Sequence, residues 1–268
     1  MAEVLGARTG VFGRATYFEI TEPVVEHAHP HVHLLFKLGG GDRRMLVEGV
    51  AADVTDTQCL LISPWQRHAD LDEQPGEPTL MLALYLDAGW IASRLGVHAV
   101  SFDALGSTVT PAMLAGARRI GAALAGTPLG DAELVELIGD IAAEAAADHL
   151  VDRRTGLSDY RIRHALRKLR ERPHLHVDYR DVARDVGLSR SHFYEQFRSS
   201  VGVAPNMFVD SLVLEQAYSL MSDSDRPLDE IASHLGFSAQ SSFTRFFRYR
   251  VGFPPSTLRR QIDRDRPA

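Results

Sequence analysis

The sequence has a single cysteine, Cys59, so an intramolecular disulfide framework is excluded. The apolar residues that follow Cys59 predict a buried thiol, and such sparing use of cysteine is typical of a reducing compartment. No apolar run approaches the roughly 20 residues that a membrane-spanning helix needs. The N-terminus also lacks the basic stretch and apolar run of a signal peptide. The sequence therefore predicts a cytoplasmic protein with no membrane partner.

The chain has fewer basic than acidic residues, 29 Lys and Arg against 35 Asp and Glu, which gives a net charge of −6. The excess of acidic residues is confined to the first part of the chain. Residues 1–156 carry a net charge of −10, whereas residues 157–268 carry +4. A nucleic-acid-binding protein needs a basic surface, so only the second part is suited to that role. A chain of 268 residues is also long enough for two domains, each with its own core.

One short pattern occurs twice in the basic part. Residues 182–205 contain in order Val-Ala, Gly-Leu-Ser, Phe, Phe-Arg, Gly and Pro, and residues 231–255 contain Ile-Ala, Gly-Phe-Ser, Phe, Phe-Arg, Gly and Pro. The offset between the copies is 49 residues up to the serine and 50 residues from the first phenylalanine onward. The second copy thus has one extra residue after Gly-x-Ser. Such internal repetition indicates two copies of one supersecondary unit.

Each copy predicts a helix, a tight turn and a second helix. Gly187 and Gly236 suit the end of the first helix, because glycine adopts positive φ at little cost. Ser189 and Ser238 suit the N-cap of the second helix. The two phenylalanines of each copy are four residues apart and share the inward face of that helix. An ordinary αα-hairpin is the alternative, but the polar and basic outer faces favour two DNA-binding helix-turn-helix units.

The two units, joined by a long helix through residues 208–217, resemble the DNA-binding domain of the AraC/XylS family of transcription regulators. The second copy matches the family pattern at Ile231-Ala232, Gly236-Phe237, Phe243-Thr-Arg-Phe-Phe-Arg248, Gly252 and Pro255. Glu195 stands where the family often has Arg, Val213 replaces a usual Arg, and Leu258 replaces a usual Tyr. The resemblance covers residues 157–268 and implies an all-α domain that binds double-stranded DNA.

The outward residues of each second helix are the candidates for base reading: Arg190, Ser191, His192, Tyr194 and Glu195 in the first unit, and Gln240, Ser241, Ser242 and Arg245 in the second. The side chains of Arg245, Gln240 and Glu195 suit guanine, adenine and cytosine respectively. Arg198 and Arg248 follow an inward phenylalanine and are better placed for phosphate. The resemblance implies that the two helices enter successive major grooves, ~34 Å apart.

The first part of the chain predicts short strands separated by turns, at Ala15–Ile20, His33–Leu38, Arg43–Val47, Gln58–Ile62 and Thr79–Leu86. This spacing favours a β-sandwich or a jelly-roll barrel. The resemblance of the second part implies that residues 1–105 are a cupin-like sensor domain. The predicted fold class is therefore α+β with two domains, a cupin-like barrel followed by helices and an all-α domain with two helix-turn-helix units.

Four histidines occupy alternate positions, His27, His29, His31 and His33, and would share one side of an extended strand unless Pro30 bends it. Under the cupin resemblance, His27 and His29 are metal ligands, His33 stands where the family has Glu, and His68 matches a later ligand. Neutral imidazoles bind zinc, nickel, iron or copper. The alternatives are an organic effector without metal, a pH-sensing cluster, or histidines that are merely hydrogen-bonded.

A small-molecule effector would lie near these histidines, with Phe36, Trp65 and Tyr85 as candidate walls of its pocket. The alternative is that Trp65 and Tyr85 are core aromatics.

Residues 106–152 predict two helices, Pro111–Ala125 and Asp131–His149, with Asp131 as the cap of the second. Its apolar stripe contains the candidates for a homodimer interface, Leu134, Leu137, Ile138 and Ile141. Docking of that stripe within the chain is the alternative. The polar segment Val151–Gly156 is the predicted linker, and the next helix is predicted from Ser158 to about Glu171.

The sequence favours a ligand-responsive transcription regulator, without catalytic residues, that binds DNA as a homodimer and contacts RNA polymerase if it activates transcription. One alternative is a cupin metalloenzyme of the dioxygenase or isomerase type fused to a DNA-binding domain, but that activity leaves the duplicated unit unexplained. Another is an architectural DNA-binding protein, which leaves the barrel without a role.

Overall fold

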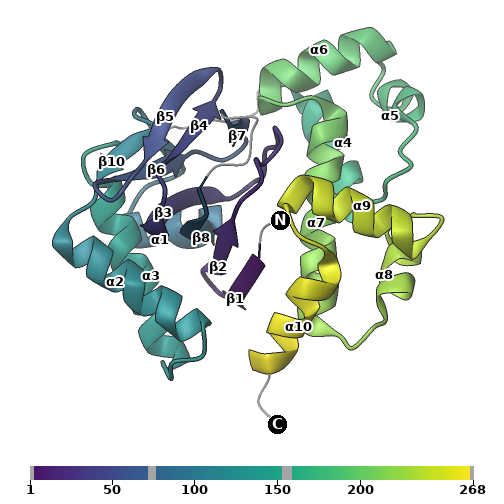
Figure 1. Cartoon of the computed structure of the whole chain (residues 1–268). Coiled ribbons are helices and arrows are strands. Elements are labelled where there is room, and N and C mark those ends of the chain that lie inside the picture. Colours follow the sequence, from purple (N-terminus) through teal and green to yellow (C-terminus); the bar gives the residue numbers. More distant parts are fainter. Residues whose placement is uncertain (1–2, 72–76, 153–158, 266–268) are drawn as a thin grey trace.

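The computed structural model describes residues 3–71, 77–152 and 159–265. The sheets lie on one side of the molecule and the helices α4 to α10 on the other (Figure 1). Among the described residues, no helix combines the length and apolar character needed to cross a membrane. From position 153 onward, the predicted linker lies outside the described residues.

The N-terminal part contains two main antiparallel sheets. The larger has the strand order β1-β2-β8-β3-β6-β10 and the smaller the order β5-β4-β7. The strands are β1 (Glu3–Gly10), β2 (Gly13–Ile20), β3 (Val32–Gly40), β4 (Arg43–Val47), β5 (Val50–Val54), β6 (Gln58–Ile62), β7 (His68–Asp70), β8 (Thr79–Leu86) and β10 (Gly106–Thr108). A separate pair is formed by β9 (Val100–Phe102) and β11 (Leu150–Asp152). Five of these strands were predicted within a few residues, whereas β1, β5, β7 and the later short strands were missed.

Side chains alternate between the two faces of the six-stranded sheet, and each face contributes residues to a buried core. On β3, Leu34 and Phe36 point toward the helices that cover the sheet, and His33 and Leu35 point to the opposite, inner side. The covering helices are α2 (Pro111–Leu124) and α3 (Asp131–Ala146), and α1 (Ala88–Leu95) lies beside them. Cys59 faces the helix side and is fully buried, which raises the pKa of its thiol to about 12.

The apolar stripe of α3 is used within the chain. Leu134, Ile138 and Ile141 are at most 3% exposed and pack in one core with α2 and the sheet. Leu137 is half-buried against the same core. These four residues are therefore not a free dimer surface, which corrects that prediction. Asp131 does not cap α3 either, since the N-cap is Gly130 and makes no side-chain cap hydrogen bond.

The C-terminal part consists of α4 (Tyr160–Glu171), α5 (Tyr179–Asp185), α6 (Arg190–Val201), α7 (Pro205–Asp223), α8 (Leu228–His234), α9 (Gln240–Val251) and α10 (Pro255–Asp265). The pairs α5–α6 and α8–α9 are the two copies of the sequence repeat, and α7 is the long helix between them. Val213 and Leu258, which depart from the family pattern, are both buried in the core of these helices.

The helical part packs directly on the sheets. Helix α10 lies beside β1, where Gln261 Nε2 donates to the carbonyl oxygen of Val4 at 2.7 Å. One continuous cluster of buried side chains joins the inner face of the sheets to the core of the helices, from Val4 and Leu35 to Phe247 and Leu258. A large apolar contact of this kind opposes free motion of two parts of a chain relative to each other.

Candidate nucleic-acid interface and inner cavity

The first helix-turn-helix pair forms as its sequence predicts. Gly187 has φ +70° and ends α5, and the backbone N–H of His192 donates to Ser189 Oγ at 3.3 Å, so Ser189 is the N-cap of α6. Phe193 and Phe197 are fully buried. The opposite face of α6 is therefore presented to solvent.

The structure places most of the base-reading candidates of α6 on this open face. Arg190, Ser191, His192 and Glu195 are exposed, as is the phosphate candidate Arg198. Tyr194 differs: it is half-buried, with its ring 5.6 Å from that of Tyr179 and 6.1 Å from that of Phe193. Tyr194 therefore packs in part against residues of its own unit.

The second pair differs from the first at the start of α9. Gly236 has φ +91° and ends the turn, but the N-cap is Ala239 and makes no side-chain cap hydrogen bond. The prediction of Ser238 as N-cap is therefore wrong. The extra residue after Gly-x-Ser moves the start of the helix one position along the chain and leaves the serine outside it.

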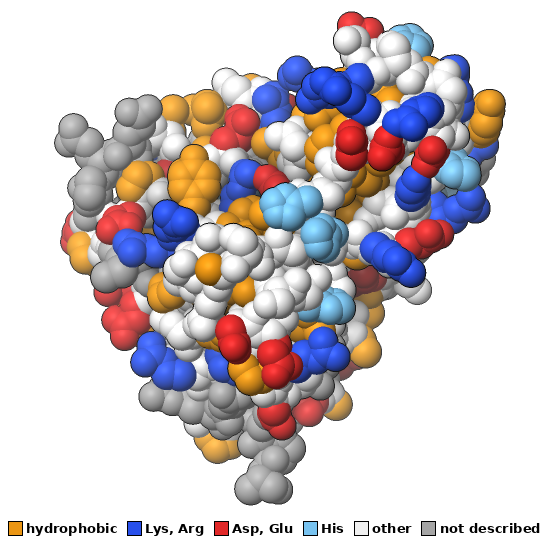
Figure 2. Space-filling model, turned by 90° about the vertical axis from the view of Figure 1, so that its right-hand side faces the viewer, with side chains coloured by type: hydrophobic (Ala, Val, Ile, Leu, Met, Phe, Trp, Pro, Cys, Tyr) orange, Lys and Arg blue, Asp and Glu red, His pale blue; other side chains and the backbone are white. Residues whose placement is uncertain are grey.

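The candidates of α9 also lie mainly on an open face. Gln240, Ser241 and Arg245 are exposed, and Ser242 is half-buried. Arg248 is exposed, but its guanidinium lies 3.9 Å from the carboxylate of Glu22, in the segment that follows β2. Figure 2 shows the side of the molecule that carries α5 and α8, where Lys and Arg side chains are more frequent in the upper part and are mixed with acidic ones.

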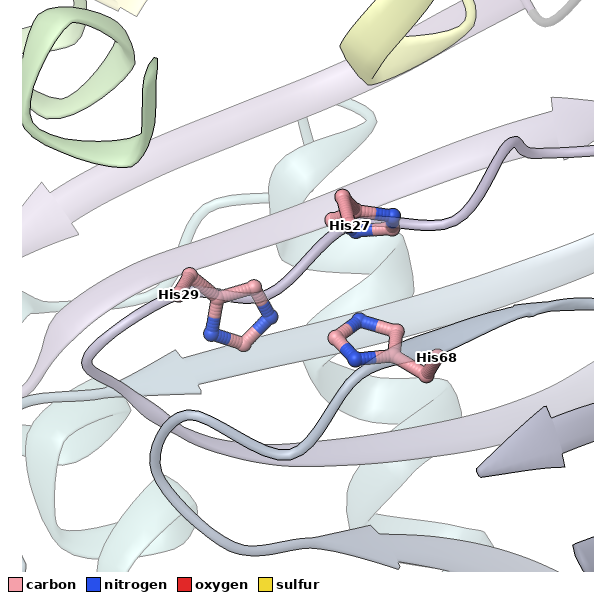
Figure 3. A group of neighbouring side chains, drawn as sticks. All are labelled: His27, His29 and His68. Carbon is pink, nitrogen blue, oxygen red and sulfur yellow. The ribbon is translucent and has the colours of Figure 1, made fainter. Parts of the chain in front are cut away.

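Three predicted metal ligands converge in the N-terminal part. The backbones of His27 and His68 form an antiparallel bridge, with N···O distances of 3.0 and 2.9 Å, and their ring centroids are 4.2 Å apart. The ring centroids of His29 and His68 are 4.9 Å apart. One ring nitrogen of each of the three lies within 4.8 Å of those of the others (Figure 3).

Hydrogen bonds fix the direction of two of these rings. His27 Nδ1 lies 2.8 Å from the carbonyl oxygen of Val25, and His68 Nδ1 lies 2.9 Å from that of Gln66. Because a carbonyl can only accept, each Nδ1 carries the proton and each neutral ring keeps its lone pair on Nε2. Carbonyl oxygens commonly orient metal-binding histidines in this way.

Burial keeps the cluster neutral. It lowers the pKa of His27 to about 4, and burial together with neighbouring imidazoles holds the pKa of His29 and His33 well below the usual 6.5. Within the described part of the chain, His68 Nε2, His29 Nδ1 and His33 Nε2 are buried without a hydrogen-bond partner. Neutral rings with unpartnered nitrogens fit the donor set of a transition-metal site.

The two remaining histidines of the alternating run behave differently. His33 is adjacent to the group, with its Nδ1 3.2 Å from His29 Nε2, but it is not among the three convergent ligands. His31 points away, because its Nε2 lies 3.5 Å from the carboxylate of Glu215 on α7. The segment before β3 is not a continuous strand, so the four side chains do not share one side.

The histidines border a cavity of about 80 Å³ between the two sheets and the C-terminal helices. Tyr85 lines it, as predicted, and its ring stacks on His33 with centroids 4.3 Å apart. Phe36 does not, because it belongs to the opposite face of β3. Trp65 does not line it either. It has φ +67°, unusual for a bulky residue, and stacks on Phe208 of α7 with centroids 4.8 Å apart.

The sequence alone did not identify several further residues that line the cavity. Arg14 of β2 is 6% exposed, and its guanidinium carbon lies 4.2 Å from the ring centroid of Tyr85 and 3.5 Å from that of Tyr218 on α7. Ser211 and Glu215, also on α7, line the same cavity. Positions 211, 215 and 218 recur on one helical face, so the periodicity of α7 was the available signal.

Comparisons with known proteins match the C-terminal part in sequence. Residues 182–261 match a family model described as a helix-turn-helix domain. The probable transcriptional regulator LumQ of Photobacterium leiognathi is 38% identical over 69 residues, which cover 26% of this chain and 28% of that protein. The HTH-type transcriptional regulator ExsA of Pseudomonas aeruginosa is 36% identical over 83 residues, 31% of this chain and 30% of that protein. The chain thus matches less than a third of the length of these curated relatives.

The whole chain is similar in fold to solved structures. ToxT from Vibrio cholerae O395, bound to (E)-4-(8-methylnaphthalen-1-yl)but-3-enoic acid, has a TM-score of 0.59 at 11% identity, covering 96% of this chain and 99% of that one. An unsaturated-fatty-acid-bound ToxT from strain SCE256 has a TM-score of 0.59 at 11% identity, covering 95% and 97%. At this identity the likeness establishes the fold alone.

Proposed function

We propose that the chain is a sequence-specific DNA-binding transcription regulator of the AraC type, controlled by a ligand in its inner cavity, on the basis that residues 182–261 match a helix-turn-helix family model. The observation that carries the proposal is the duplicated helix–turn–helix pair, which presents polar and basic faces of α6 and α9 to solvent while the phenylalanines of each helix are buried. The relatives are named as regulators, and nothing in the comparisons supports the enzyme alternative.

We assign the N-terminal part, a cupin-type jelly roll in this proposal, the role of sensor. The ToxT structures hold a naphthalenyl butenoic acid and an unsaturated fatty acid. A pocket for a drug-sized ligand occupies roughly 300–1,000 Å³. The cavity in this chain is about 80 Å³, so it suits an ion or a molecule of a few heavy atoms rather than ligands of that size.

The donor set formed by the histidines of the cavity supports a divalent transition metal as part of the ligand. His27 and His68 would hold it through Nε2, and His29 would complete a three-nitrogen site with His33 beside it. Three protein nitrogens leave a coordination position open. The metal would supply a Lewis-acidic centre there, and the carbonyls of Val25 and Gln66 would orient its ligands.

A homodimer and contact with RNA polymerase remain part of the proposal. The dimer surface would have to lie outside the stripe of α3, because Leu134, Ile138 and Ile141 are buried within one chain.

Substitution of two arginines of α9 should distinguish contacts that read bases from contacts with the DNA backbone. We expect Arg245→Ala to cost ~1–3 kcal/mol in binding free energy and to relax the preference at one base position. Arg248→Ala should weaken binding to all sequences about equally and reduce the salt dependence of affinity. Binding of randomised duplexes at several salt concentrations measures both effects. If both variants lose affinity with the preferred sequence unchanged, the division of roles is wrong.

Sequencing of genomic fragments captured by the purified full chain, with and without added zinc or nickel, tests the function itself. Sites with two short sequence blocks about one helical turn apart are expected if α6 and α9 both read bases. Recovery of one block alone would mean that only one helix reads bases. The first unit, which carries Glu195, would then contact only the DNA backbone. Failure to enrich any sequence under either condition would refute the proposal.

A further inference from the structure

The cavity has a second set of polar groups besides the histidines, and part of it belongs to the C-terminal helices. His27 and His68 present lone pairs. In the same lining, the described structure gives no hydrogen-bond partner to Arg14 Nε, Ser211 Oγ or Arg250 Nε, although all three atoms are buried. An arginine Nε–H can only donate, and leaving such a group unpaired in the interior is costly.

The ion pairs around the cavity leave Arg14 as its least completely paired arginine. Arg43 is paired with Asp70, with 2.7 Å between Nη2 and Oδ2, and Arg250 is paired with Asp210. The contact of Arg14 with a carboxylate is longer, 3.8 Å from Nη1 to Glu215. The buried guanidinium of Arg14 therefore retains capacity to donate to the oxygens of a bound anion.

Building on the proposed sensor function, we infer that the cavity binds a small oxyanion, a carboxylate or a phosphate, held by Arg14 of the sheet and Ser211 of α7. The cavity of about 80 Å³ is small beside the roughly 300–1,000 Å³ of pockets for drug-sized ligands, which favours a small anion. The oxygens of such an anion accept from Arg14 Nε and Ser211 Oγ. The histidines of the same lining remain available to a metal or to a donor group of the ligand.

This site makes α7 a wall of the sensor. Ser211, Glu215 and Tyr218 lie on the helix that joins the two helix-turn-helix pairs, and Phe208 on the same helix stacks on Trp65. An anion that binds Arg14 and Ser211 together stabilises one position of α7 relative to the sheets. Because coupling is reciprocal, DNA that favours a given position of α7 changes the affinity for the anion by the same factor.

Ser211→Ala tests the inference with little risk to folding, because it removes only a buried hydroxyl that has no partner within the described residues. Acetate and phosphate are titrated separately into the full chain, with chloride at matched ionic strength as reference. Thermal melting and tryptophan emission in a Trp90→Phe background, which leaves Trp65 as the remaining tryptophan, are the readouts. Ser199→Ala, the same change at an exposed position of α6, is the matched control.

We expect saturable stabilisation by at least one oxyanion beyond the effect of chloride, and an affinity about tenfold weaker in Ser211→Ala but unchanged in Ser199→Ala. A response to acetate alone identifies an organic carboxylate, and a response to phosphate alone identifies a phosphate ligand. The inference is refuted if neither anion exceeds chloride or if Ser211→Ala binds as the wild type does. Genomic capture is scored separately, so the regulator function can stand when the anion site fails.

Discussion

Phe247→Ala is expected to lower the free energy of unfolding by about 3–5 kcal/mol, the usual cost of removing a buried phenylalanine. Phe247 is fully buried, and its ring centroid lies 5.4 Å from that of Tyr218, 5.8 Å from Phe243 and 6.2 Å from Phe253. The side chain therefore joins the second helix-turn-helix pair to α7. Its loss should also abolish DNA binding at temperatures where the wild type still binds.

The same variant tests whether the two parts of the chain unfold together. Both tryptophans, Trp65 and Trp90, lie in the N-terminal part, whereas most helix belongs to the C-terminal part. Because one apolar cluster spans both parts, denaturant curves followed by tryptophan emission and by far-ultraviolet circular dichroism should shift together. Tyr249→Ala, at a position that is 64% exposed on the same helix, should change stability by no more than about 0.5 kcal/mol. A shift of the circular dichroism curve alone would mean independent unfolding.

The local features of the helical part were predictable because they follow from short-range physics. Glycine at positive φ, the Ser189 cap and paired phenylalanines each depend on a few neighbouring residues. The prediction of Ser238 as the N-cap of α9 was wrong because the second copy has one extra residue after Gly-x-Ser. The sequence contained the shift in offset, but only the structure assigns that shift to the start of α9 rather than to the turn.

The cavity was predictable only in part, because its walls come from distant segments. The cupin resemblance grouped His27, His29 and His68, which converge in the structure, and Tyr85 lines the cavity beside them. The prediction for Phe36 was wrong because neighbouring side chains of β3 point to opposite faces of the sheet, and Leu35 rather than Phe36 faces the cavity. Proximity to His68 along the chain suggested Trp65, but the strained backbone at Trp65 directs the ring to Phe208.

The contribution of α7 could not be predicted, because it depends on how the helices dock on the sheets. Arg14 reads as an ordinary strand arginine, and Glu215 as a surface residue of a linking helix. Only tertiary packing brings Arg14 between Tyr85 and Tyr218 and places Glu215 beside His31. The same packing occupies the stripe of α3, so the prediction of a dimer interface there was wrong although the amphipathic pattern was real.

A transition metal at the histidines should stabilise the chain strongly, because the folded state assembles ligands that lie far apart in the sequence. At a concentration one hundred times its dissociation constant, a metal that binds only the folded state adds about 2.7 kcal/mol to the free energy of unfolding. We expect stabilisation of about this size from at least one of zinc, nickel, iron and copper, and its loss on addition of a chelator. Three nitrogen ligands and an open position set the stoichiometry at one ion per chain.

His68→Gln should remove most of this stabilisation, since His68 contributes an Nε2 lone pair that is already oriented by the carbonyl of Gln66. His31→Gln is the matched control, because its ring faces Glu215 rather than the group, and it should keep the metal response. Melting temperatures with each metal and with chelator, together with elemental analysis of protein purified without an affinity tag, measure the effect. Equal loss of the response in both variants would mean that the metal binds by general histidine affinity rather than at this site. Absence of bound metal and of any shift would leave His27, His29 and His68 as a neutral wall of the cavity, with Arg14 and Ser211 as its recognition elements.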